Sequence, residues 1–392
     1  MSQHNKNGVQ VPLHWHPSPP PALFRSRVTT FRSTNISLSD NETIDPPNKK
    51  QTEPPRNTGL VIRFNETEKS VARAAIKRAL EAVGLTSMTH TFIHEESNEI
   101  GANVIAVQKG PYFGTGNDKM MILSANYDTV EGSQGVDDNG SGVAAVLEAA
   151  RVMSTLDNLY SRQNTIVYVF FDMKHKALAG SHAFVEDVLL PLMERTNTRV
   201  VGTIIADGLL HFDPFPGSQA MPPEFESFFP EAAQKLHEHS HMGDFIQISS
   251  RNDVDEELVR KYTRAYDRSC EMLSTDWPFH PWSLNLEMNI GNITTLDRLH
   301  PFLYSDHSSF FFHSKQKNVQ IPTIYLSDTL SLRGVRQYCV QCDGLYMMTE
   351  QNMKFLALMT DSLIRLLIDM SGSSASEVVD DLYSFMFNID VE

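Results

Sequence analysis

The chain of 392 residues carries a formal net charge of −15, and 41% of its residues are hydrophobic. This length and composition suffice for one large α/β domain with tails, or for two domains. The negative charge argues against nucleic acid as the main partner, because phosphates are bound by basic surfaces. No apolar run is as long as a membrane span, and the N-terminus lacks the apolar core of an export signal.

The sequence does not establish the cellular location. Its N-glycosylation sequons are compatible with a secreted or luminal protein if a leader is missing. They begin at Asn35, Asn41, Asn65, Asn139 and Asn292. We expect no glycan on Asn139, since it lies inside the loop that carries the predicted site.

The three cysteines are too few for a disulfide framework. Cys339 and Cys342 form a CxxC pair, but a zinc ribbon needs a second such pair. We therefore expect two ordinary thiols in a loop rather than a metal or redox site.

The predicted elements begin after a tail at residues 1–57 that is rich in Pro, Ser, Thr and Asn and is predicted to be disordered. Residues 58–371 form one predicted domain, and residues 372–392 form an acidic C-terminal tail. The first predicted elements of the domain are a helix over residues 66–83 and two strands at 90–93 and 103–108.

The middle of the chain alternates buried strands with helices. The strands are predicted at residues 120–123, 165–172 and 200–206, and the helices at 142–153 and 178–195. This rhythm predicts an α/β fold with a mixed, mostly parallel central sheet and helices on both faces. An irregular insertion at about residues 209–243 follows, and the later elements are a strand at 244–249, a helix at 255–272, a last strand at 321–326 and a closing helix at 351–369.

Acidic residues follow the first central strand in a loop that contains Gly132 and Gly135. They are Asp128, Asp137 and Asp138. Open α/β sheets hold their ligands at the carboxyl ends of their strands, so this loop is the predicted site.

The same passage resembles metallopeptidase family 28, the co-catalytic zinc aminopeptidases and carboxypeptidase Q relatives. The resemblance rests on Asn126-Tyr127-Asp128 and on the GVDDNGSG run at 135–142, where the family has HxD and GxDDNxSG. Four further segments extend it, namely FFDMKHKALAGS at 170–181, IIAD at 204–207, SDHSSF at 305–310 and YLSDTLSLRGVRQYC at 325–339. The resemblance implies a zinc exopeptidase fold of the phosphorylase-hydrolase-like type.

The resemblance also implies a chemistry in which two zinc ions share a bridging carboxylate and a glutamate takes the proton of a bound water. It assigns the bridge to Asp137, a second aspartate ligand to Asp207 and a histidine ligand to His307. Asp138 would shape the loop rather than bind metal.

Three positions depart from the family pattern. Asn126 stands where the family has a zinc histidine, and His175 replaces a glutamate ligand. Lys174 stands at the position of the general base, and a protonated lysine cannot accept a proton from water.

These departures separate two metal sites. Asn126, Asp137 and Asp207 would make a weak first site, whereas Asp137, His175 and His307 could hold one zinc with an open position. Alternatively Lys174 offsets the carboxylates through salt bridges, and no zinc is bound. We expect zero or one zinc ion.

Several other residues allow a structural or a functional interpretation. Asp128 would orient the first histidine in active relatives, but here we expect it to bond the loop. Tyr338 lies where the family contacts substrate. The insertion contains His211, His237, His239 and His241. The alternate spacing of the last three is compatible with metal binding, although solvated side chains are favoured.

The sequence therefore predicts a degenerate member of the family in which peptide hydrolysis is lost or strongly reduced, with a role in binding a peptide or protein ligand. The alternative is an active one-zinc aminopeptidase or carboxypeptidase, or an enzyme that resembles the glutaminyl cyclases. The substrate, the partner and the oligomeric state are not predicted.

Overall fold

The computed structural model describes residues 62–273, 277–290, 299–313, 319–339 and 341–377. The tail predicted at 1–57, the part of the C-terminal tail after residue 377, and the sequons at Asn35, Asn41 and Asn292 lie outside these ranges. None of the described helices is both long enough and apolar enough to cross a membrane.

The described residues contain one eight-stranded sheet with the order β1-β2-β4-β3-β5-β8-β6-β7. Its strands are β1 (Ser87–His94), β2 (Glu99–Gln108), β3 (Lys119–Asn126), β4 (Ile166–Phe171), β5 (Arg199–Ala206), β6 (Phe245–Arg251), β7 (Trp282–Met288) and β8 (Thr323–Ser327). The pairs β3/β4, β3/β5, β5/β8 and β6/β7 are parallel, whereas β1/β2, β2/β4 and β6/β8 are antiparallel. The predicted mixed sheet is confirmed.

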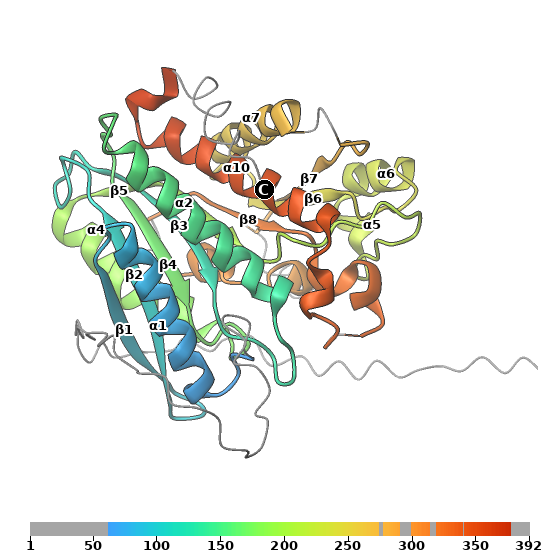
Figure 1. Cartoon of the computed structure of the whole chain (residues 1–392), viewed down its shortest axis with the longest axis horizontal. Helices are drawn as coiled ribbons and strands as arrows, with labels where there is room; N and C mark the ends of the chain where they lie inside the picture. The colour runs from blue at the N-terminus through green and yellow to red at the C-terminus, as the bar shows by residue number, and fades with distance from the viewer. Residues whose placement is uncertain (1–61, 274–276, 291–298, 314–318, 340, 378–392) are drawn as a thin grey trace, which may run out of the picture.

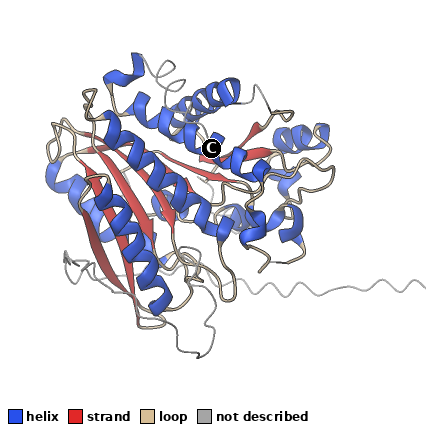
Figure 2. Ribbon diagram, viewed as in Figure 1, coloured by secondary structure: helices blue, strands red, loops and turns tan. Residues whose placement is uncertain are grey.

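Helices cover both faces of this sheet (Figure 2). They are α1 (Glu66–Ala82), α2 (Gly142–Leu156), α3 (Ala179–Ala183), α4 (Leu190–Thr196), α5 (Phe225–Phe228), α6 (Pro230–Glu238), α7 (Glu256–Leu273), α9 (His307–Phe311) and α10 (Glu350–Met370). Figure 1 shows α1, α2 and α10 side by side across the near face of the sheet.

The core consists of two apolar layers, because successive side chains of a buried strand point to opposite faces. On β3, Met121 and Leu123 pack with helices α1, α2, α7 and α10, whereas Met120 and Ile122 pack against residues 184–190 and Phe310. Every side chain of β4 is buried. This double burial explains why its sequence IVYVFF is continuously apolar.

The first helix shows how sequence fixes an element boundary. The side chain of Asn65 accepts a hydrogen bond from the backbone N–H of Glu68, and the Glu68 carboxylate accepts one from the Asn65 N–H. This capping box satisfies two donors at the start of α1. One strand, β7, was not predicted from the sequence, and the assignment of residues 209–243 as an insertion stays a prediction.

Candidate functional site

The candidate site lies where β3, β4, β5 and β8 end, at a single edge of the sheet. Because these strands run parallel, the polar residues that follow them converge there. Asn126 ends β3, Asp207 follows β5, and Asp328 follows β8. Lys174 lies in the turn after β4, and the short helical turn η1 (Val136–Ser141) adds Asp137 and Asp138.

A buried lysine occupies the centre of this site. The side chain of Lys174 is 2% exposed, and its Nζ lies 2.6 Å from Oδ1 of Asp207 and 3.1 Å from Oδ1 of Asp138. Burial acts to lower the pKa of Lys174, but the two carboxylates outweigh it and hold that pKa well above its usual value. The side chain is therefore an ammonium at neutral pH.

A second cation, Arg336, approaches Asp138 and two further carboxylates from the loop after β8. Its Nη1 lies 3.1 Å from Oδ2 of Asp137 and 3.5 Å from Oδ2 of Asp343, and its Nη2 lies 3.5 Å from Oδ2 of Asp138. The Asp343 carboxylate also accepts the backbone N–H groups of Asp137 at 2.7 Å and Asp138 at 2.9 Å. Sequence reasoning missed both Arg336 and Asp343.

The two neighbouring aspartates have different surroundings. Asp138, predicted only to shape the loop, is the one that joins Lys174, whereas Asp137 pairs with Arg336 and accepts the N–H of Leu210. Burial acts to raise the pKa of Asp138, but Lys174, His175 and Arg336 bring it below its usual value. For Asp137, burial and then the carboxylate of Asp328 raise the pKa.

Both polar atoms of the Asn126 side chain are hydrogen-bonded within the protein. Its Oδ1 accepts a hydrogen bond of 2.9 Å from Nδ2 of Asn139, and its Nδ2 donates to the backbone oxygen and Oδ1 of Asp128. Asn139 is fully buried, and its Oδ1 accepts the N–H groups of Gly142 and Gly208. A side chain held in this way inside the folded protein is not accessible for glycosylation.

Asp128 holds the turn that carries the lysine. Its Oδ1 accepts the N–H of Lys174 at 3.2 Å, and its Oδ2 accepts the N–H of His175 at 3.3 Å. Asp207 is also fixed by a hydrogen bond on the oxygen that does not face Lys174. The Ser305 hydroxyl donates to this Oδ2 at 2.7 Å. These bonds fix the geometry around Lys174.

The predicted histidine ligands do not converge with the carboxylates. His307 is fully buried between Tyr325 and Phe311, and its Nε2 donates to the backbone oxygen of Phe302 at 3.2 Å. Burial lowers the pKa of His307 to about 3. Nδ1 of His307 and Nε2 of His175 are buried without a hydrogen-bond partner.

These residues do not fit a zinc centre. Among the described residues, no group of three or more His, Cys, Asp and Glu side chains is arranged to hold a metal ion. The ammonium of Lys174 already lies between Asp138 and Asp207, where it would repel a dication.

The rim of the site includes a disulfide that was not expected. Cys339 and Cys342 are bonded to each other, so the prediction of two free thiols is wrong. The bond closes the loop between Arg336 and Asp343. Tyr338, which lies where the family pattern has a substrate-contacting loop, is 87% exposed beside it.

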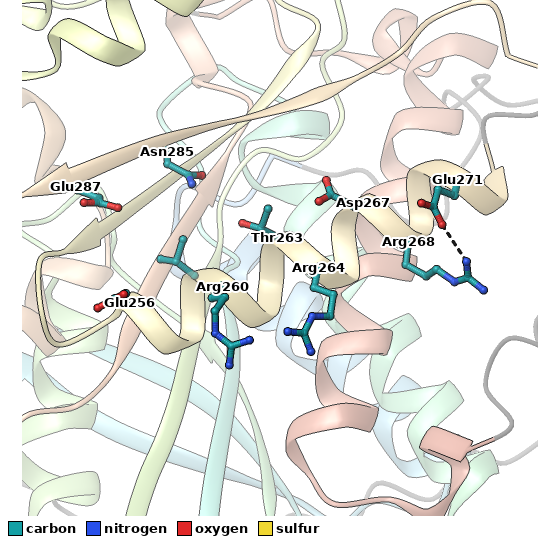
Figure 3. A pocket seen from close by; sticks show the side chains of 10 residues that line it. Glu256, Arg260, Thr263, Arg264, Asp267, Arg268, Glu271, Asn285 and Glu287 are labelled. Carbon is teal, nitrogen blue, oxygen red and sulfur yellow. Dashed lines mark hydrogen bonds and ion pairs between the residues drawn. The ribbon is translucent and has the colours of Figure 1, made fainter.

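A separate surface groove of about 630 Å³ lies between α7 and the edge strand β7 (Figure 3). Arginine and carboxylate side chains line it together, and Arg268 pairs with Glu271. Its lining includes none of the residues around Lys174, so this groove is distinct from the candidate site.

Comparisons with known proteins agree with this architecture. The model of peptidase family M28 matches residues 103–239, which include β2 to β5 and the turn that carries Lys174. Over this part the chain is similar to peptidase family M28. Aminopeptidase YwaD of Bacillus subtilis (strain 168) is 28% identical over 111 residues, which are 27% of this chain and only 23% of that protein.

Two longer matches extend over most of the chain. The uncharacterized protein YfbL of Escherichia coli (strain K12) is 24% identical over 325 residues, 78% of this chain and 87% of that protein. The crystal structure of LapB from Legionella pneumophila superposes with a TM-score of 0.50 and 16% identity, covering 79% of this chain and 67% of LapB. The family relationship suggests zinc, while the number of ions stays a prediction.

Proposed function

We propose that this protein is a family M28 member in which peptide hydrolysis is lost or strongly reduced, and that it binds a peptide or protein ligand. The observation that carries the proposal is the buried ion pair of Lys174 with Asp207, in which Nζ lies 2.6 Å from Oδ1. A cation that belongs to the chain supplies the charge that the family resemblance assigns to zinc.

The first argument concerns proton transfer. The resemblance puts a general base at position 174, and the surrounding carboxylates hold the pKa of Lys174 well above its usual value. An ammonium has no lone pair with which to accept a proton from water. Loss of a general base alone costs about 10²- to 10⁴-fold in rate.

The second argument concerns charge. Asp137, Asp138 and Asp343 surround the guanidinium of Arg336, and Asp138 and Asp207 share Lys174. Buried carboxylates require compensation, and these two cations supply it. A zinc ion added to this set would have to displace the lysine.

A binding role agrees with the surface of the loop that bears Arg336. Large apolar side chains of this segment are exposed by 40% to 87%. They are Val335, Tyr338, Leu345, Tyr346, Met348 and Met353. Tyrosine and methionine are enriched in protein interfaces, so this segment is the part of the site that we expect to contact a ligand.

The one-zinc enzyme remains a second candidate because Nε2 of His175 and Nδ1 of His307 are buried without a partner. Zinc content of purified, tag-free protein discriminates the two. We expect that mutation of His175 does not change the zinc content. We also expect that the protein neither hydrolyses a panel of aminoacyl p-nitroanilides nor cyclises glutaminyl peptides. One zinc per chain that is lost in His175→Ala, together with hydrolysis or cyclisation that chelators abolish, would overturn the proposal.

A gain-of-function variant gives a sharper test. We expect the triple variant Asn126→His, Lys174→Glu, His175→Glu to show a zinc-dependent increase in Tm, because the cation is replaced by ligands. The matched control is the triple variant Asn126→His, His175→Glu, Lys176→Glu, which keeps Lys174. Lys176 is a suitable substitute because it pairs with Glu99 at a partly exposed position. An equal zinc response of the control would show that Lys174 does not exclude the metal.

A further inference from the structure

We propose that His237 and His241 form a second, independent site that binds a divalent transition metal ion such as Cu²⁺, Ni²⁺ or Zn²⁺. His237 lies in the last turn of α6, and His241 follows that helix by three residues. Nδ1 of His237 lies 3.0 Å from Nε2 of His241, and the two rings are nearly perpendicular. Two imidazole nitrogens therefore point at one another.

The backbone fixes this arrangement before any ion binds. Ser240 and His241 both have φ near +55°, a left-handed conformation that turns the chain back over the end of α6. The N–H of His241 donates to the Leu236 oxygen at 2.9 Å. The oxygen atoms of Ser240 and His241 accept N–H groups of Gly217 and Gln219. The turn is held from both sides, so an ion would meet a preorganised pair.

The nitrogen separation matches the needs of a metal ion. With metal–nitrogen bonds of about 2.0–2.1 Å, neighbouring ligands lie about 2.9 Å apart in a square-planar complex and about 3.3 Å apart in a tetrahedral one. The observed 3.0 Å lies between these values. An ion bound by both nitrogens would lie to one side of the line that joins them, so the rings would turn slightly and the shared proton would be released.

A cavity with both polar and apolar lining lies beside His241. This cavity of about 500 Å³ is also lined by Glu224, Glu226 and Gln219. Within the described ranges no third His, Cys, Asp or Glu side chain completes a metal site. We therefore infer that water fills the open positions, and that the ion can accept a further ligand from the cavity.

His239 is not part of this pair and supplies the control. Its ring stacks on Trp282 with centroids 4.3 Å apart, and its Nδ1 lies 4.0 Å from Oδ2 of Asp244. His239→Gln therefore removes a neighbouring imidazole without changing the pair. His237 is exposed, so His237→Ala is not expected to disturb folding, and circular dichroism would verify this.

The experiment is a titration of the tag-free full-length chain with Cu²⁺, Ni²⁺ and Zn²⁺ by calorimetry. We expect Cu²⁺ to bind most tightly, with nitrogen hyperfine structure from two imidazoles in its electron paramagnetic resonance spectrum. His237→Ala and His241→Ala should each weaken binding by about tenfold or more, and His239→Gln should leave it unchanged. Equal binding by the wild type and the His237→Ala, His241→Ala double variant would overturn the proposal, as would no binding by the wild type.

This site and the Lys174 site are tested independently. Metal that disappears in the double variant belongs to the histidine pair, whereas metal that disappears only in His175→Ala belongs to the sheet edge. Either proposal can therefore fail while the other holds.

Discussion

Lys174 and Asp207 form an ion pair of 2.6 Å in which the side chains are 2% and 1% exposed. A buried pair is weak evidence for net stability, because both charges were removed from water. Breaking it by removing one partner is costly, however, since an uncompensated charge then stays in the interior. The pair therefore makes the fold depend on the residue at the position that the family resemblance gives to the general base.

We predict that Lys174→Met, which keeps the length of the side chain but not its charge, lowers the free energy of unfolding by about 3–5 kcal/mol. The measurement is urea denaturation at neutral pH. The difference from the wild type should narrow towards acid pH, because Lys174 helps to hold the pKa of Asp138 below its usual value and its loss lets that carboxylate take up a proton more readily. Lys176→Met is the control and should cost less than about 1 kcal/mol, since its pair with Glu99 is partly exposed. Equal losses for both variants would contradict the prediction.

Asn139 links the acidic loop to β3 and β5, and we predict that Asn139→Ala is strongly destabilising. Its amide donates to Asn126 and to the oxygen of Ala206, and it accepts two backbone N–H groups. Each buried group left without a partner costs about 1–3 kcal/mol. Chemical denaturation should show a loss of several kcal/mol, whereas Asn158→Ala at an exposed position should show little change. A loss below about 1 kcal/mol for Asn139→Ala would mean that water replaces these bonds.

A dependence of stability on acid pH follows from buried histidines. Burial lowers the pKa of His90 from 6.5 to about 4, so the native state binds a proton less readily than the unfolded chain. The contribution of neutral, buried His90 to the free energy of unfolding is present above pH 6.5. It is lost as the pH falls from 6.5 to 4, and the loss is about 3 kcal/mol in total. His90→Gln should flatten the dependence of the unfolding free energy on pH over this range. An unchanged slope in His90→Gln would show that other groups dominate.

Reduction of the Cys339–Cys342 disulfide should have a limited effect on global stability. A bond that closes so short a loop restricts the unfolded chain little, and the entropic model gives about 2 kcal/mol. We predict that Cys339→Ser, Cys342→Ser lowers Tm only modestly. Alkylation followed by mass spectrometry should label Cys270 alone of the three cysteines in the unreduced, denatured wild type. Labelling of all three would show that the bond is not formed.

The central sheet could be predicted because its strands are continuous apolar runs and its helices carry periodic apolar stripes. The sequence IVYVFF of β4 has both properties of a doubly covered strand, namely β-branched residues and no alternation. The edge strand β7 was missed, since only alternate residues of its second half are buried. Edge strands carry a weaker pattern because one side of them faces solvent.

Site residues could be predicted only where they lie at the end of a predicted strand or in the loop directly after it. Lys174, Asp207 and Asn126 are such residues, and their positions at the sheet edge follow from parallel pairing. Arg336 contacts Asp137 across a separation of 199 residues, and no local pattern reports a partner at that distance. Whether Asp137 or Asp138 pairs with Lys174 likewise depends on the path of the η1 backbone. Two consecutive aspartates in the sequence do not specify that path.

The bonds from Asp343 to the N–H groups of Asp137 and Asp138 join positions more than 200 residues apart. During synthesis the acidic loop emerges long before Arg336 and Asp343, and until then its carboxylates have only part of their compensating charge. A nascent chain that stops before residue 336 would therefore expose an incomplete sheet edge. The acidic loop therefore reaches its final hydrogen bonding only after the segment with Arg336 and Asp343 has packed against it.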